Sequence, residues 1–204
     1  MRQLKILYAV SALTAAAAPL IAQSTPAYTQ ADVRFMQGMI GHHAQALAMV
    51  ALIPSRTSRD DLRALGKRIE VSQKDEIALM QQWLRDRHQQ IPSTDMSHDA
   101  RAHAMQMPGM AVSDTLMPGM LTPEQMTELA NAKAPEFDIL FLKGMIRHHQ
   151  GALAMVAQLL GITGSGQEPE VFRFAAEVDS DQRAEIARMD ALLNSLQASR
   201  PLAH

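Results

Sequence analysis

Two pairs of adjacent histidines, each flanked by methionines, are the residues of this sequence best suited to metal chemistry. The first pair is His42 and His43, with Met39 three places before His42 and Met49 seven places after it. Imidazole nitrogen binds several transition metals, whereas thioether sulfur is soft and favours Cu(I). The mixture of the two therefore predicts copper as the metal. The second pair has the same spacing and consists of His148 and His149, with Met145 and Met155.

These residues lie in a stretch that occurs twice, at 32–51 and 138–157, with thirteen of twenty positions identical. Apolar residues recur in it at intervals of three and four, which predicts one helix for each copy. On such a helix Met39, His42 and Met49 share one face. The next histidine is rotated by about 100°. The sequence therefore leaves open which histidine of each pair faces the interior.

A second pattern, QxxEIxxM, also occurs twice, at residues 73–80 and 182–189. Each half is therefore expected to form a helical hairpin. Two hairpins that bury their apolar faces against each other form an all-α, ferritin-like four-helix bundle with a long crossover. The expected helices lie near 30–53, 58–88, 135–160 and 169–197, with a short helix over 122–132.

Local signals predict where the first two helices begin and end. Thr29, with Asp32 three places later, has the residues of a capping box. Pro54 is expected to end the first helix near Ile53, because the residue before a proline disfavours helical backbone. Ser58 is expected to cap the second helix.

The composition restricts the possible functions. The chain has 204 residues, of which 47% are hydrophobic, and a net charge of -2. No strong basic stripe is present, so nucleic acid is not expected as a partner. Because the sequence contains no cysteine, thiolate is excluded as a metal ligand or nucleophile. With no nucleophile elbow either, the protein is expected not to be an enzyme.

The first 22 residues have the pattern of a secretory signal peptide. Arg2 and Lys5 precede an apolar run that ends in small residues at Ala22. A membrane anchor is the alternative, but the run is short and contains Pro19. We therefore expect a periplasmic or secreted protein that keeps no stable membrane span after cleavage. Residues 23–28 would form an N-terminal tail.

Residues 90–121 form a linker rich in Met, His, Pro and Gly between the expected hairpins at 29–89 and 122–198, which together make one domain. Such a length is unusual in a compact domain without a function. One interpretation is a second, exchangeable site in which flexible thioethers wrap around Cu(I). The other is a tether whose methionines fill gaps against the bundle. The candidate ligands in this linker are Met105, Met107, Met110, Met117 and Met120.

The doubled GMIxHHxxALAMVA, the two QxxEIxxM patterns and the segment MPGMLTPEQM together resemble the bacterial family called domain of unknown function 305, over about 29–196. The resemblance implies a ferritin-like bundle, export and, as in some members, copper binding. It also implies a metal-ligand set in this sequence. That set comprises Met39, His42, His43, Met49, Glu76, Met80, Met145, His148, His149, Met155, Glu185 and Met189, together with the MPGM at 117–120.

Three functions remain open from the sequence. The first is Cu(I) sequestration or transfer, with a copper-handling protein as a candidate partner. The second is a structural or interaction bundle, in which the histidines form hydrogen bonds with Glu76, Glu185, Gln73 or Gln182. The third is a di-iron oxidase or peroxidase. Iron is disfavoured, because Met39 and Met145 stand where the Glu-x-x-His motif of di-iron bundles requires a carboxylate.

Overall fold

The computed structural model describes residues 27–94 and 116–198, and every regular element in these two ranges is a helix. This result confirms the predicted all-α helical bundle. The predicted signal peptide (1–22) lies outside the described residues, as do most of the tail and linker residues 95–115, so those boundaries stay predictions. The helices are α1 (Gln30–Val50), α2 (Ile53–Arg56), α3 (Asp60–Asp86), α5 (Pro123–Asn131), α6 (Glu136–Gly161) and α7 (Pro169–Ala198).

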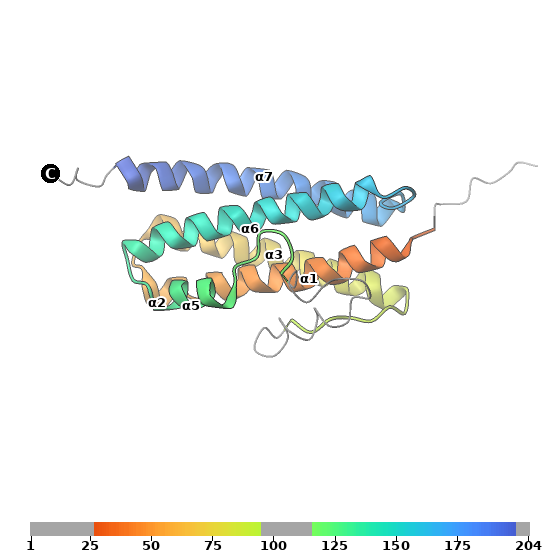
Figure 1. Ribbon diagram of the computed structural model, residues 1–204, viewed down its shortest axis with the longest axis horizontal. Coiled ribbons are helices and arrows are strands. Elements are labelled where there is room, and N and C mark those ends of the chain that lie inside the picture. The colour runs from red at the N-terminus through yellow and green to blue at the C-terminus, as the bar shows by residue number, and fades with distance from the viewer. Residues whose placement is uncertain (1–26, 95–115, 199–204) are drawn as a thin grey trace, which may run out of the picture.

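The four long helices pack in a way that follows the sequence repeat. Helix α1 packs along α3 in the first half, and α6 packs along α7 in the second. The two repeat helices, α1 and α6, run side by side in opposite directions and join the halves (Figure 1). Each repeat helix therefore has neighbours on two sides, which places most of its length in the core.

The apolar interior consists of two clusters, and each cluster contains residues from both halves of the chain. One contains Phe35, Trp83 and Phe174. The other contains Phe137 and Phe141, whose rings stack with centroids 5.9 Å apart. Burying one large apolar side chain contributes about 1.5–3 kcal/mol. Neither hairpin can bury its apolar face alone, so the halves depend on each other for stability.

The predicted capping box at the start of α1 is present, and it also ties the two halves together. The Asp32 amide donates to the Thr29 hydroxyl (3.2 Å), and the Thr29 amide donates to Asp32 Oδ2 (2.6 Å). The other carboxylate oxygen of Asp32 accepts a hydrogen bond from the Gly166 amide in the turn between α6 and α7 (2.7 Å). Gly166 has φ of 66°, a conformation that favours glycine.

Two details at the first turn differ from the sequence expectation. Helix α1 ends at Val50, and Pro54 lies in the first turn of the short helix α2, where a missing amide proton costs little. The prediction that Ser58 caps the next helix is wrong, because the residue before α3 is Arg59, whose side chain makes no capping bond in the described structure. Instead, Thr57 Oγ1 accepts a hydrogen bond from the Arg59 amide (3.2 Å).

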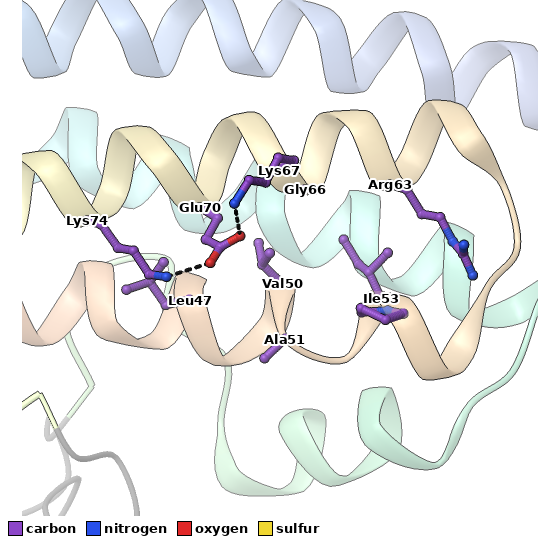
Figure 2. A pocket seen from close by; sticks show the side chains of 10 residues that line it. Leu47, Val50, Ala51, Ile53, Arg63, Gly66, Lys67, Glu70 and Lys74 are labelled. Atoms are coloured by element: carbon purple, nitrogen blue, oxygen red, sulfur yellow. Dashed lines mark hydrogen bonds and ion pairs between the residues drawn. The ribbon is translucent and has the colours of Figure 1, made fainter.

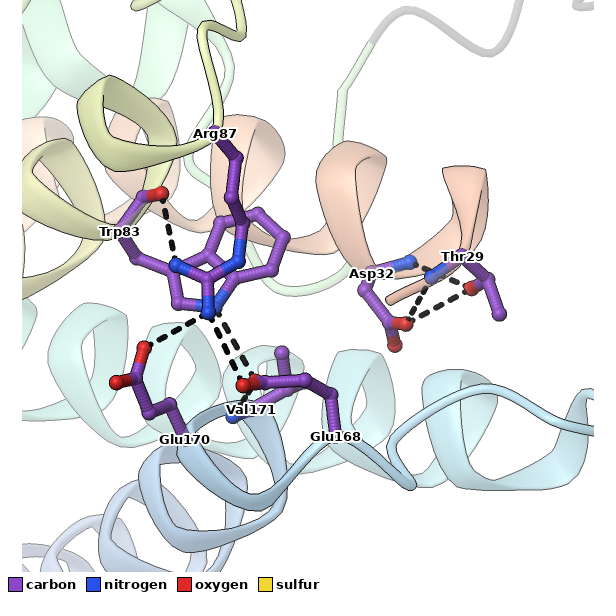
Figure 3. A network of polar contacts seen from close by, with 7 residues as sticks. All are labelled: Thr29, Asp32, Trp83, Arg87, Glu168, Glu170 and Val171. Carbon is purple, nitrogen blue, oxygen red and sulfur yellow. Dashed lines mark hydrogen bonds and ion pairs between the residues drawn. The ribbon is translucent and has the colours of Figure 1, made fainter. Parts of the chain in front are cut away.

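The end of α3 is fastened to the start of α7 by a polar network around Arg87 (Figure 3). The guanidinium lies 4.3 Å from the centre of the Trp83 ring and pairs with Glu168 (3.0 Å) and Glu170 (2.9 Å). Glu168 also accepts hydrogen bonds from the Trp83 indole (3.3 Å) and from the Val171 amide in the first turn of α7 (2.9 Å). The network therefore holds one end of the two hairpins together.

None of the helices in 27–94 and 116–198 combines the length and the apolar character needed to cross a membrane.

Candidate metal centre

All four histidines of the repeated pairs are buried where α1 meets α6. Their exposed fractions are 0% for His42 and His149 and 1% for His43 and His148. The rings of His42 and His148 lie next to each other in a tilted arrangement, with centroids 3.8 Å apart and planes inclined by 36°. Both histidines of each pair thus face the interior, which the sequence left open. The equivalent residues His42 and His148 meet at the junction of the two halves.

The central histidines are held by backbone carbonyl groups. His42 Nε2 donates to the carbonyl oxygen of Pro118 (2.9 Å), and His148 Nε2 donates to the carbonyl oxygen of His42 (3.0 Å). A carbonyl only accepts, so each Nε2 must carry the proton. In a neutral ring Nδ1 then keeps its lone pair. Among the described residues, Nδ1 of His42 is buried without a hydrogen-bond partner.

The outer histidine of the first half, His43, pairs with a carboxylate. Its Nε2 forms a short contact with Glu76 Oε2, and the other oxygen of Glu76 accepts from the Ser72 hydroxyl (2.9 Å). Nδ1 of His43 is buried and has no partner in the described structure. A carboxylate on one imidazole nitrogen with the other nitrogen free is the arrangement that commonly supports a metal-binding histidine.

The outer histidine of the second half, His149, lacks this support. Within the described ranges, neither of its buried ring nitrogens has a hydrogen-bond partner of ordinary geometry. The equivalent carboxylate, Glu185, instead faces two arginines: its Oε1 lies 3.4 Å from Arg188 and 3.7 Å from Arg68. Its Oε2 is buried without a partner among the same residues. The two halves therefore differ at this point despite the repeat.

Burial keeps three of these imidazoles neutral. The pKa of His42 is lowered to about 3, mainly by burial and also by the neighbouring His43, against the opposing effect of the hydrogen bond to the Pro118 carbonyl. Burial likewise lowers the pKa of His149 to about 3, aided by His43 and His42 and opposed by the Met145 carbonyl. The pKa of His148 is also lowered well below 6.5, mainly by burial. Neutral imidazole is the form that coordinates a metal.

The predicted methionine ligands of the helices are buried in two groups related by the repeat. Met39, Met80 and Met155 belong to one core cluster, and Met145, Met189 and Met49 belong to the other. Each group combines two methionines from one half with one from the opposite half. We call the first group together with His43 the first site, and the second group together with His149 the second site.

The MPGM segment of the linker crosses the bundle beside the first site. A Cβ atom added at Gly38 would lie 3.4 Å from Met117 Sδ and 3.5 Å from Met155 Cε, so both methionine side chains pack beside Gly38. At the equivalent Gly144, the neighbours would be Met49 Cε (3.2 Å) and Leu121 Cδ2 (3.3 Å). The first site therefore has an additional thioether where the second has a leucine.

The crossing depends on residues that differ between the two copies of the repeat. At Gly151, a Cβ would come within 1.8 Å of the Pro118 carbonyl oxygen, so only glycine fits there. The equivalent residue in the first copy, Gln45, exchanges two hydrogen bonds with the backbone of Leu121 (2.9 and 2.8 Å). Arg147 donates to the side chain of Gln125 (2.6 Å). Sequence reasoning missed these residues, although the departures from the repeat were visible.

The remaining predicted ligands are placed as follows. Met120 is half-buried, and its carbonyl oxygen lies 3.5 Å from Arg147. Met105, Met107 and Met110 lie outside the described residues, so the structure does not place them. Nowhere in 27–94 or 116–198 do three or more His, Cys, Asp or Glu side chains converge in a manner suited to a metal ion.

The histidines do not line the surface groove between α1 and α3. That groove, of about 440 Å³, has an apolar floor that includes Val50 and Ile53 (Figure 2). On its rim, Glu70 pairs with Lys67 (3.1 Å) and Lys74 (2.5 Å). None of the predicted metal ligands lies in its lining.

The fold and the buried histidine and methionine residues define a helical-bundle protein with an internal set of imidazole and thioether groups. The family model described as Domain of unknown function (DUF305) matches residues 32–193, and the chain belongs to this family. No curated protein sequence matches the chain.

Solved structures with this fold include two DUF305 proteins. A fragment from Deinococcus radiodurans is 31% identical, with a TM-score of 0.67, over 83% of this chain and 99% of that one. A candidate secreted protein from Streptomyces coelicolor is 27% identical, with a TM-score of 0.66, over 85% and 97% of the two chains.

CopM, solved with bound copper, also shares the fold. Its Cu(I)-bound form is 24% identical, with a TM-score of 0.59. Its Cu(II)-bound form is 25% identical, with a TM-score of 0.57. In both comparisons 80% of this chain and 96% of CopM are covered.

Proposed function

We propose that this protein binds copper, preferably Cu(I), and holds it for sequestration or transfer rather than for catalysis. The observation that carries the proposal is the burial of four histidines together with six methionines in two groups related by the repeat. Thioether and imidazole ligands suit Cu(I), and the low pKa values keep His42 and His149 in the neutral, coordinating form. CopM, which shares the fold, is known in Cu(I)-bound and Cu(II)-bound forms.

Unpaired ring nitrogens give a physical reason for a ligand. A buried polar group without a hydrogen bond costs about 1–3 kcal/mol. Nδ1 of His42, Nδ1 of His43 and both nitrogens of His149 are such groups among the described residues. A bound metal ion would use the lone pair on Nδ1 of His42 and of His43, and the one on the unprotonated nitrogen of His149. Iron is disfavoured for the same site, because its sulfur groups are thioethers and its carboxylates are few.

The proposal includes export to the periplasm or the medium, where the protein would exchange copper with a copper-handling partner. The signal-peptide pattern of residues 1–22 supports export, as does the likeness to a candidate secreted protein.

A structural bundle without metal is the second candidate, and the hydrogen bonds of His42 and His148 to backbone carbonyls favour it. Metal analysis of protein purified from copper-supplemented cells, without metal-chelating steps, separates the two. Copper is expected to co-purify with the wild type, and the amount of copper per protein is expected to be lower when both histidine pairs are changed to Gln. Protein that carries no copper, or that carries iron in its place, would contradict the proposal.

A further inference from the structure

The two sites differ most in the carboxylate that faces the outer histidine. Glu76 and Glu185 occupy equivalent places on α3 and α7, and their exposed fractions are 8% and 7%. Glu76 makes the short contact with His43. Within the described residues Glu185 forms no hydrogen bond with His149, and its Oε1 accepts one from Arg188 instead. Equivalent residues on equivalent helices have therefore formed different partnerships.

The cause lies in the residues around each carboxylate that the repeat does not share. Arg188, three places after Glu185, corresponds to Leu79, three places after Glu76. Leu79 carries no charge and leaves its carboxylate free to pair with the imidazole.

A second cation, Arg68, also attracts Glu185 and so disfavours its pairing with His149. It reaches Glu185 from α3 (3.7 Å), while the residue at its repeat-equivalent place on α7 is the acid Glu177, which cannot pair with Glu76. Ser72, which donates to Glu76, corresponds to Asp181, which has no hydrogen to donate when ionised. All three differences stabilise the carboxylate–imidazole pair in the first half and disfavour it in the second.

We propose that the two sites bind metal with unequal affinity, the first more tightly, and that Arg188 is the positioning residue that weakens the second by holding Glu185 away from His149. This inference rests on the proposed function. A carboxylate that accepts a hydrogen bond from one imidazole nitrogen fixes the ring and makes the other nitrogen a better ligand. Loss of such a partner typically costs about 10–100-fold in metal affinity. The additional thioether of Met117 beside Met155 strengthens the first site in the same sense.

Two reciprocal variants test the inference. Arg188→Leu gives α7 the residue of α3 and should let Glu185 pair with His149. Leu79→Arg gives α3 the residue of α7 and should draw Glu76 from His43. Both side chains are about half exposed, so the fold is expected to tolerate both changes, and circular dichroism checks that it does.

Affinities are measured by anaerobic competition for Cu(I) against a chromophoric chelator. The wild type is expected to show two classes of binding. Arg188→Leu should tighten the weak class about 10-fold or more, and Leu79→Arg should weaken the tight class by a similar factor. Arg188→Lys keeps a cation and should leave both classes near wild type. Adding Glu185→Gln to Arg188→Leu should remove the gain, because the carboxylate is then absent.

Nitrogen-15 NMR of the histidines in metal-free protein provides a readout that does not depend on copper. The carboxylate-bonded Nε2–H signal should be present for His43 in the wild type and should appear for His149 in Arg188→Leu. If that signal does not appear, or if the variant binds copper like the wild type, the role of Arg188 is refuted while copper binding stands. If the wild type binds no Cu(I), the proposed function itself fails.

Discussion

Replacing His149 by Leu should stabilise the metal-free protein, whereas replacing His43 by Leu should destabilise it. The two histidines are equivalent in the repeat and both are buried, with exposed fractions of 0% and 1%. Their environments predict changes of opposite sign in the free energy of unfolding. His149 buries two ring nitrogens that have no hydrogen-bond partner of ordinary geometry in the described structure, and His43 pairs with Glu76.

The magnitudes follow from the cost of an unpaired buried polar group, about 1–3 kcal/mol. Leucine has a similar volume and no polar atoms, so His149→Leu should raise the free energy of unfolding by about 1–3 kcal/mol. His43→Leu leaves the buried Glu76 with the hydroxyl of Ser72 alone, and should lower the free energy of unfolding by about as much. Both variants should lose copper affinity.

Urea unfolding at pH 7 in the presence of a metal chelator measures both changes. The free energy of unfolding is taken from the midpoint and the slope, and the slope should be unchanged if both states keep their compactness. His149→Gln serves as a polar control and should gain less than His149→Leu. If His149→Leu loses more than about 1 kcal/mol, the ring must have a stabilising partner, and the reasoning on the second site is refuted.

Three further outcomes are expected. A histidine whose pKa is lower in the folded than in the unfolded chain stabilises the fold at pH values above its unfolded pKa, near 6.5. The free energy of unfolding should therefore fall as the pH drops from about 6.5 toward 3, by up to about 1.4 kcal/mol per pH unit for each such group. Urea midpoints from pH 7 to pH 4 measure this, and a flat profile would contradict it. Gly151→Ala places a Cβ 1.8 Å from the Pro118 carbonyl oxygen and should cost about 1–3 kcal/mol, whereas Gly161→Ala, with no described atom within 4 Å, should be near neutral in the same thermal or urea assay. Changing Met105, Met107, Met110, Met117 and Met120 together to Leu keeps the apolar volume, so a lower silver stoichiometry would indicate a linker site and an unchanged one a tether.

The helices were predictable because their signals are local. Apolar residues at intervals of three and four predicted each repeat helix, and the expected capping box of Thr29 and Asp32 is present. The capping box of α5, with Thr122 and Gln125, likewise needs only four consecutive residues. The Ser58 prediction failed because two neighbouring hydroxyl residues could serve the same turn, and the chain uses Thr57.

The burial of both histidines in each pair could not be predicted from one helix face. Helix α1 has α3 on one side and α6 on another, so two directions about 100° apart both point into the core. The periodicity of a single helix does not contain that information. The pairing of the halves was needed to place His42 against His148 and His43 against Glu76.

The inequality of the two sites also depends on contacts between distant residues. Arg68 reaches Glu185 from a different helix, and the linker residue Pro118 accepts from His42 across the bundle. The sequence held signs of this asymmetry, because Gln45 and Gly151 differ inside an otherwise similar repeat, as do Leu79 and Arg188. The first of these differences marks a place where the linker meets the bundle.

X-ray absorption at the copper edge of protein loaded anaerobically with one equivalent of Cu(I) tests the central claim most directly, because it identifies the ligand atoms. The account predicts a reduced copper ion with both sulfur and imidazole nitrogen in its coordination shell, with the imidazole contribution lost when His42, His43, His148 and His149 are all changed to Gln. A shell of nitrogen and oxygen without sulfur, or protein that retains no copper after desalting, would contradict it.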